Sequence, residues 1–137
     1  MGTFRSTEEA REYFKNDLFA FRSQMVLDEL GEDYALCSVP VHEGLMNANG
    51  GVMGGAIFTL ADLAFAALTN QLHMPTVAQQ VNIVYLSATK GKRLFARAEL
   101  VKSGRTSTVV NVAVTDDSGR DVARFTGVGF KLPKGGR

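Results

Sequence analysis

The stretch NANGGVMGGAIFTLADLAFAALTN, residues 47–70, begins with glycines and continues as an apolar segment that carries one acid, Asp62. Residues 44–89 contain no Lys, Arg or Glu and no other Asp. A carboxylate in such surroundings loses hydration, which costs free energy and raises its pKa. We therefore predict a functional role for Asp62. The alternative is a structural carboxylate that lies at the helix surface or pairs with a distant Arg.

Apolar residues recur along this stretch with helical spacing. One stripe, at i, i+3, i+4, i+7 and i+11, consists of Ile57, Leu60, Ala61, Ala64 and Leu68. A neighbouring face carries Phe58, Asp62, Phe65 and Thr69. Gly54 and Gly55 mark the beginning of the helix, and Pro75 marks its end. The many alanines keep the helix thin, so the pattern predicts a buried central helix with a sheet wrapped around it, and not a membrane span.

The N-terminus of this helix would present unpaired N–H groups and a partial positive charge, which suit a developing oxyanion. Glycine leaves the backbone open to a ligand there, so Gly54 or Gly55 is a candidate electrophilic site and Asp62 a candidate base or nucleophile. Eight residues of helix separate Gly54 from Asp62, a distance of about 12 Å. One carbonyl group cannot contact both. If both act on it, they come from two copies of the chain, which predicts an active site at a dimer interface.

Six other segments have the β-branched enrichment or the alternation that is typical of strands. They are residues 25–30, 34–41, 77–86, 94–102, 106–115 and 122–131. Upstream, Ser6 and Glu9 resemble a capping box that begins an amphipathic helix extending to about Phe21. The sequence therefore predicts a single α+β domain over residues 1–137, with about six mostly antiparallel strands wrapped around one long helix. An extra N-terminal helix and a disordered tail at residues 134–137 complete the prediction.

The composition argues against several classes of protein. The 137 residues are 45% hydrophobic, enough for a substantial core, and the net charge of +1 gives no field that favours nucleic acid. The single cysteine, Cys37, and a start without an apolar signal segment indicate a cytoplasmic protein. His42 and His73 lack metal-ligand spacing, and a nucleophilic Cys37 would need a nearby His. The mixed charges of the N-terminal helix argue against membrane binding.

The signature of the PaaI-type hot-dog-fold acyl-CoA thioesterases resembles the string Asn47-x-x-Gly50-x-x-Met53-Gly54-Gly55-x-x-Phe58-x-Leu60-x-Asp62. The resemblance extends from about Phe19 to Lys131. It implies a hot-dog fold and hydrolysis of the thioester of a coenzyme A conjugate, often an aryl or medium-chain acyl group. Coenzyme A is then part of the substrate, and no cofactor is implied. The resemblance also implies a homodimer, with the acid and the oxyanion helix from opposite subunits, and a tetramer of such dimers.

The same resemblance implies roles for individual residues. Asp62 would be the catalytic carboxylate, Gly54 the backbone donor to the thioester carbonyl, and Asn47 a residue that holds the water or the thioester. Residues assigned to the rest of the substrate are Met53, Gly55 and Phe58, and also Gln79 and Asn82, which begin a strand expected near the site. The alternative for the last two is that polar residues are common at the start of a strand. Met53 departs from the family, which usually has His there, and a thioether donates no hydrogen bond. Either the site is retuned, or the methionine packs against the acyl chain.

Basic residues gather at two predicted turns. These residues are Lys90, Lys92 and Arg93 at one turn, and Lys102 and Arg105 around Gly104 at the other. The family places the nucleotide end of coenzyme A against the corresponding loops, so both groups could contact its phosphates. The alternative is that these turns carry Lys and Arg for solubility.

A rival function is a hot-dog module that binds or senses an acyl-CoA without cleaving it. Met53 favours this alternative, and Asp62 argues against it. A hydratase of the same fold is less favoured, because its chemistry needs an acid–base pair and no His accompanies Asp62 in its stretch.

Overall fold

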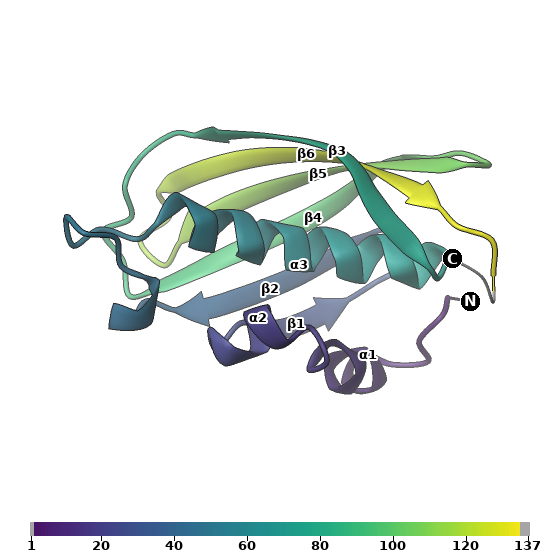
Figure 1. The fold of residues 1–137 in the computed structure, drawn as a ribbon, viewed down its shortest axis with the longest axis horizontal. Helices are drawn as coiled ribbons and strands as arrows, with labels where there is room; N and C mark the ends of the chain where they lie inside the picture. The colour runs from purple at the N-terminus through teal and green to yellow at the C-terminus, as the bar shows by residue number, and fades with distance from the viewer. Residues whose placement is uncertain (1, 135–137) are drawn as a thin grey trace.

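A long helix, α3 (Gly54–Leu72), lies across one face of a six-stranded sheet (Figure 1). The computed structural model describes residues 2–134, so the predicted tail beyond Lys134 lies outside the described residues. The strands are β1 (Val26–Leu30), β2 (Tyr34–Pro40), β3 (Thr76–Tyr85), β4 (Arg93–Ser103), β5 (Ser107–Asp116) and β6 (Asp121–Lys131). Three shorter elements are α1 (Thr7–Phe14), α2 (Leu18–Arg22) and the 3-10 turn η1 (Glu43–Leu45).

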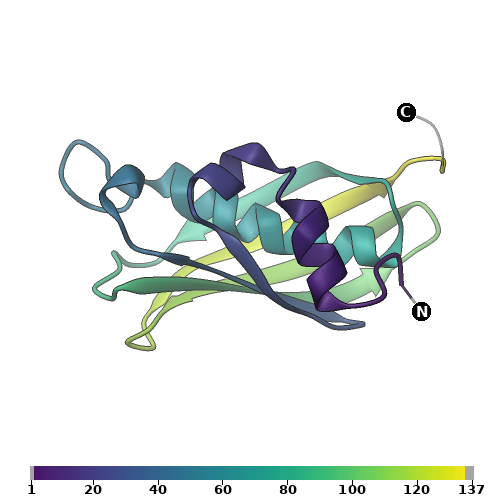
Figure 2. The ribbon, with the colours of Figure 1, turned by 90° about the horizontal axis from the view of Figure 1, so that it is seen from below.

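The sheet has the spatial order β1-β2-β4-β5-β6-β3, and every pair of neighbours is antiparallel. All six predicted strands are confirmed, with ends that differ by one residue at most. The sheet curves around α3, which lies in its hollow side (Figures 1 and 2). The predicted α+β architecture, a mostly antiparallel sheet around one central helix, is therefore confirmed.

The apolar stripe of α3 forms the centre of the core. All five residues predicted for this stripe are buried, namely Ile57, Leu60, Ala61, Ala64 and Leu68. They pack against strand residues whose side chains point to the same side of the sheet, among them Ala96, Val112 and Phe125. By length and composition α3 would be apolar enough to cross a membrane, and its burial against the sheet accounts for that apolarity.

Glycines of β6 allow α3 to lie close to the sheet. A Cβ on Gly127 would lie only 2.7 Å from Cε1 of Phe65. The Phe65 ring is 2% exposed and packs against Phe125, with ring centroids 5.9 Å apart. Because the ring is enclosed, it has little room to move away from an added methyl group.

The prediction of one N-terminal helix extending to about Phe21 is wrong, because two short helices occupy this segment (Figure 2). Arg11 fixes α1 to β1 by donating hydrogen bonds to the carbonyl oxygens of Leu27, at 2.7 Å, and Asp28, at 3.1 Å. The chain turns between Phe14 and Leu18, where Asn and Asp are poor helix formers. The capping box is half formed: Ser6 Oγ accepts from Glu9 N–H, whereas the Glu9 carboxylate accepts from Arg5 N–H.

The β3 strand is an edge of the sheet and carries apolar side chains that face solvent. About half of the surface of Val77, Val84 and Tyr85, and of the following Leu86, is exposed. An edge strand presents unpaired N–H and C=O groups along its length, which can pair with another strand. This edge therefore has both the apolar surface and the backbone groups needed for association.

Replacing Gly127 by Ala should destabilise the fold by about 1–3 kcal/mol, because the methyl group would press on the enclosed Phe65 ring. Urea unfolding measures the change. Gly51→Ala is the matched control, since a Cβ there would meet nothing closer than 3.8 Å. Equal stability of the two variants would show that the packing of α3 tolerates the extra carbon.

Candidate active site

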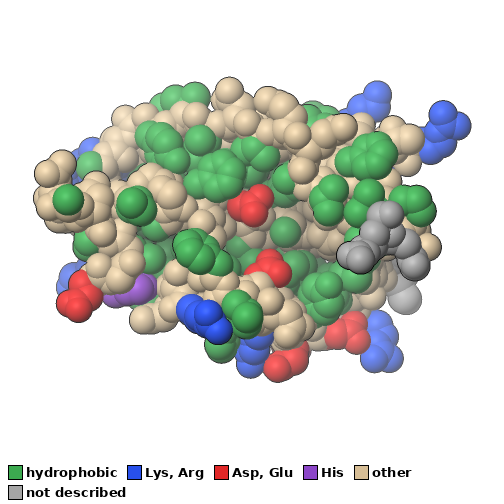
Figure 3. All heavy atoms as spheres, in the orientation of Figure 1, with side chains coloured by type: hydrophobic (Ala, Val, Ile, Leu, Met, Phe, Trp, Pro, Cys, Tyr) green, Lys and Arg blue, Asp and Glu red, His purple; other side chains and the backbone are tan. Residues whose placement is uncertain are grey.

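Asp62 lies half-buried in the middle of α3 and lines a hollow of about 310 Å³ beside α2. The other residues of this hollow are Asp17, Leu18, Phe19, Ala20, Phe58, Thr59 and Leu63. On the face of the molecule drawn in Figure 3, acidic side chains are bordered by hydrophobic ones. The ion pairs found within residues 2–134 use other carboxylates, so Asp62 has no Arg or Lys partner there. The structural alternative of an ion-paired Asp62 is thus not observed in the described chain.

Burial raises the pKa of Asp62, and the negative charge of Asp17 raises it further. Asp17 precedes α2 at the N-cap position, where its side chain makes no capping hydrogen bond. Burial also raises the pKa of Asp17. Sequence reasoning missed this second acid, because the helical pattern was extended through the turn that brings Asp17 over α3. The hollow therefore contains two carboxylates with raised pKa values, and the charge of Asp17 disfavours the ionised form of Asp62.

The N-terminus of α3 forms a second hollow, also of about 310 Å³, lined by Val52, Gly54, Ile57 and residues 85–88. The N–H groups of Ala56 and Ile57 donate to the carbonyl oxygen of Met53. The N–H groups of Gly54 and Gly55 have no acceptor within residues 2–134. Tyr85, which sequence reasoning also missed, donates its hydroxyl to the Gly54 carbonyl oxygen at 2.9 Å. Two free N–H groups at the positive end of a helix can stabilise an anion.

The two hollows are separate in one chain. Gly54 and Asp62 lie eight residues apart on a continuous helix, which corresponds to about 12 Å. Of the residues that line the two hollows, none is common to both. The described chain therefore does not bring the acid and the free N–H groups of α3 together.

Asn47 organises the loop that leads into α3. Its Oδ1 accepts from the N–H groups of Asn49, at 2.9 Å, and Gly51, at 3.1 Å. Gly50 completes this turn with a φ of 83°, a conformation that favours glycine. The side-chain oxygen of Asn47 is thus used within the loop, and its amide NH₂ is the group left for a ligand. Its predicted role toward water or the thioester stays a prediction.

The residues predicted to contact the rest of the substrate lie in different places. Met53 is 53% exposed at the N-cap of α3, next to Gly55. Phe58 lines the Asp62 hollow and packs edge-on against Phe125. Gln79 and Asn82 are exposed on the edge strand β3, outside both hollows. Within one chain, only Met53, Gly55 and Phe58 lie in or beside a hollow of α3.

The two basic groups lie at opposite ends of β4. Lys90, Lys92 and Arg93 follow residues 85–88 of the Gly54 hollow, at the end of the molecule where α3 begins (Figure 1). The turn that contains Lys102, Gly104 and Arg105 lies about 30 Å away, at the other end of this 11-residue strand. Arg93 donates to Ser38 Oγ, and the Gly104 carbonyl oxygen accepts from Lys131. A single chain therefore cannot bind one group of phosphates with both turns.

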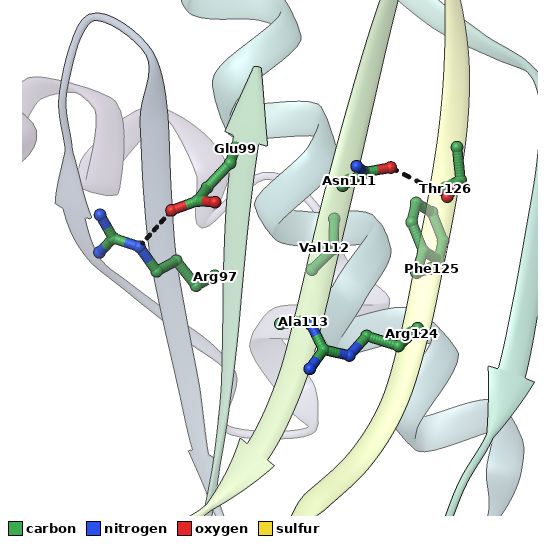
Figure 4. Close-up of a pocket in the computed structure, with 8 residues that line it drawn as sticks. All are labelled: Arg97, Glu99, Asn111, Val112, Ala113, Arg124, Phe125 and Thr126. Carbon is green, nitrogen blue, oxygen red and sulfur yellow. Dashed lines mark hydrogen bonds and ion pairs between the residues drawn. The ribbon is translucent and has the colours of Figure 1, made fainter. Parts of the chain in front are cut away.

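Another hollow, of about 430 Å³, lies on the face of the sheet opposite α3 (Figure 4). Its polar side chains largely satisfy one another: Arg97 pairs with Glu99 at 3.0 Å, and Thr126 donates to Asn111 at 3.0 Å. Neither Asp62 nor Gly54 lines it. We therefore do not assign catalysis to this hollow.

Cysteine and histidine take structural positions. Burial raises the pKa of the Cys37 thiol, and the charge of Asp28 adds to this effect, so the thiolate needed of a nucleophile is disfavoured. His42 Nε2 contacts the Ser23 carbonyl oxygen and His73 Nε2 the Leu132 carbonyl oxygen. Among residues 2–134, no three His, Cys, Asp or Glu side chains gather in a way that could hold a metal ion.

Comparison with known proteins gives the family. A family model described as "Thioesterase superfamily" matches residues 49–123, more than half of the chain. The chain belongs to this superfamily. A putative esterase of Archaeoglobus fulgidus is 32% identical over 128 residues, covering 91% of this chain and 82% of the relative. The predicted class of enzyme, a thioester hydrolase, is thereby confirmed.

Two further members of the thioesterase superfamily are similar over most of the chain. The acyl-coenzyme A thioesterase PaaI of Escherichia coli is 25% identical, covering 93% of this chain and 92% of the relative. The solved structure of E. coli PaaI matches 92% of each chain with a TM-score of 0.85 and 24% identity, which confirms the hot-dog fold. The crystal structure of a hypothetical thioesterase protein with coenzyme A from Streptococcus pneumoniae TIGR4 has a TM-score of 0.80 and 28% identity, covering 87% of this chain and 96% of that one.

Replacing Asp17 by Asn should lower the pKa of Asp62, because the burial remains but the neighbouring negative charge is lost. A carboxylate that acts in its ionised form is then active at lower pH, so the acidic limb of the kcat/KM profile should move to lower pH. The measurement is a pH–rate profile for thioester hydrolysis. Glu8→Gln, which removes an exposed charge from α1, should leave the limb in place. An unmoved limb in Asp17→Asn would contradict the coupling.

Proposed function

We propose that the protein hydrolyses the thioester of an acyl-coenzyme A in a dimer, with Asp62 of one subunit and the Gly54 N–H of the other in each active site. The observation that carries this proposal is the layout of α3. One helix has an acid without a cationic partner at its middle and free glycine N–H groups at its beginning, about 12 Å apart. The names of the E. coli and S. pneumoniae relatives, which mention acyl-coenzyme A and coenzyme A, support the choice of substrate.

In this mechanism the thioester carbonyl oxygen accepts a hydrogen bond from the Gly54 N–H, at the positive end of α3. The bond strengthens as negative charge develops on that oxygen in the tetrahedral transition state. Asp62 either takes a proton from the attacking water or attacks the carbonyl carbon itself, giving a mixed anhydride that water then hydrolyses. Both routes break the C–S bond and release a carboxylic acid and the coenzyme A thiol.

The β3 edge is the surface that we assign to dimer formation. Its exposed apolar side chains and unpaired backbone groups suit a second copy of the same strand. Tyr85, at the end of β3, is bonded to Gly54, so a copy that joins there lies next to the N-terminus of α3. The tetramer implied by the resemblance stays a prediction, as does the cytoplasmic location.

The acyl group is assigned to the hollow around Asp62. Leu18, Phe19 and Phe58 give this hollow apolar walls, which suit an aryl or medium-chain acyl group. Lys90 and Lys92, beside the Gly54 hollow, are assigned to the phosphates of coenzyme A. Any contact from Lys102 and Arg105 would have to come from another subunit, because their turn lies at the far end of β4.

Asp62→Asn should reduce turnover by orders of magnitude and leave the dimer intact, because the amide keeps the shape of the side chain but is not a base.

Gly54→Pro removes the proposed donor at a helix position that tolerates proline, and should cost roughly 100–1,000-fold in kcat. Gly54→Ala is its matched control, since it keeps the N–H and adds the same Cβ beside Tyr85. Thiol release from acyl-CoA measures all three variants.

Mixing the two inactive variants tests the shared site. An Asp62→Asn subunit paired with a Gly54→Pro subunit has one intact site, so an equimolar, re-equilibrated mixture should regain about a quarter of wild-type activity. A mixture that stays as inactive as its components would place both groups within one subunit and contradict the composite site.

Met53→His introduces the imidazole that the family usually has at this exposed position. If Met53 merely lacks a family hydrogen bond, the substitution should hold or raise turnover, because the Gly54 N–H is a backbone group and survives. The kcat for acyl-CoA hydrolysis measures this. A collapse of kcat would instead show that the Met53 thioether has its own role, such as packing against the acyl chain.

The alternative function, an acyl-CoA-binding module, is favoured by Met53 alone. A panel of acyl-CoAs and enoyl-CoAs separates the two functions, with binding measured by calorimetry and cleavage by the released thiol. Binding without thiol release would favour the module and refute the proposed hydrolysis.

A further inference from the structure

Asp116 is a buried carboxylate that lines neither hollow of α3. It ends β5 and is 3% exposed. It accepts hydrogen bonds from two turns that are remote from each other in sequence. One oxygen accepts from Thr89 Oγ1 at 2.8 Å, Lys90 N–H at 3.0 Å and Gly91 N–H at 3.2 Å. The other accepts from Ser118 N–H at 3.0 Å, Ser118 Oγ at 2.6 Å and Arg120 N–H at 3.1 Å.

These donors hold the pKa of Asp116 well below its ordinary value, with the Ser118 hydroxyl as the largest cause. All of them are neutral hydroxyl or backbone N–H groups. The carboxylate is therefore satisfied without the ammonium or guanidinium of any neighbouring basic residue. Its effect is to bind the β3–β4 connection to the β5–β6 turn.

The adjacent Asp117 adds a further hydrogen bond between the β3–β4 connection and the β5–β6 turn, which together we call the junction. Its Oδ1 accepts from Lys92 N–H at 2.9 Å. A Cβ at Gly91 would overlap this Oδ1, so a side chain at position 91 would displace the Asp117 carboxylate from Lys92. Residues 89–92 are thus fixed by two consecutive carboxylates at the end of one strand.

The junction brings together three basic residues from two turns. The backbone N–H groups of Lys90 and Arg120 bind the two oxygens of the same carboxylate, and Lys92 is bonded to the next residue. Their side chains are exposed, and none of the ion pairs within residues 2–134 involves them. The connection continues directly from residues 85–88, which line the Gly54 hollow. Arg120 was not predicted, because nothing in the sequence places it beside Lys90.

We propose that Asp116 is a positioning residue for substrate binding, which gathers Lys90, Lys92 and Arg120 into one cationic cluster for the phosphates of the substrate. The inference rests on the proposed function, since it takes coenzyme A as the phosphate-bearing part of the substrate. Three cations held on a fixed backbone lose less freedom on binding a phosphate than cations on a mobile loop. The cluster acts on binding and takes no part in the chemical step.

Asp116→Asn keeps one acceptor oxygen and replaces the other with an NH₂ group that opposes the N–H donors of one turn. We expect the KM for acyl-CoA to rise about tenfold or more, because the loss of one charge-assisted contact to a phosphate weakens binding by about this factor. The kcat should not change. The N-acetylcysteamine thioester of the same acyl group lacks the phosphates, and its KM should change far less. Asp121→Asn, at the same turn but bonded to Arg124 through its side chain, is the matched control and should change neither KM.

Lys90→Gln and Arg120→Gln test the cluster without disturbing the buried carboxylate, should Asp116→Asn fail to fold. Each should raise KM for acyl-CoA and leave the N-acetylcysteamine thioester unaffected. The inference is overturned if both variants bind acyl-CoA normally, or if Asp116→Asn impairs the two substrates equally. Absence of any thioester hydrolysis by the wild-type protein would instead refute the proposed function.

Discussion

A straight helix cannot bring its own beginning and middle to one small group, and this constraint governs the protein. In α3 the free N–H groups of Gly54 and Gly55 lie about 12 Å from Asp62. The sheet fixes the helix in place, since the apolar stripe is buried and Gly127 allows close approach of Phe65. In the proposed dimer, each chain supplies one half of each site, and the exposed edge β3 is the surface assigned to the second chain.

Much of the fold could be predicted because its signals are local. The stripe of α3 follows from residue spacing, and each strand was placed within one residue by alternation and turn residues. The prediction of a single N-terminal helix is wrong for a physical reason. Its helical pattern is continuous in sequence, but Arg11 ties α1 to β1, and the chain must turn before α2 can cover α3. The spacing of apolar residues indicates which side of a helix is buried, but it does not indicate where the helix ends.

Only some residues of the candidate site are visible in the sequence. Asp62 and Gly54 stand out because an isolated acid and a glycine pair at a helix start are visible in the sequence. Asp17 and Tyr85 are not, since each reaches α3 through tertiary contacts; the Tyr85 hydroxyl binds Gly54 from 31 residues away. Arg120 is likewise brought to Lys90 by a carboxylate 26 residues from that lysine. The sequence indicates the chemistry of single side chains, whereas only the topology of the sheet shows which of them lie close together.

Asp62 and Asp116 show how the environment shifts the pKa values of two carboxylates in opposite directions. Asp116 is more deeply buried, yet six hydrogen bonds from neutral donors favour its charged form and lower its pKa. Asp62 is only half-buried but has no cationic partner in the described chain, and burial and Asp17 both raise its pKa. A carboxylate that is fully hydrogen-bonded has little tendency to bind a proton or attack a carbon. Asp62 accepts no hydrogen bond within residues 2–134 and has a raised pKa, so it keeps that tendency, in keeping with the role of base or nucleophile that we propose for it.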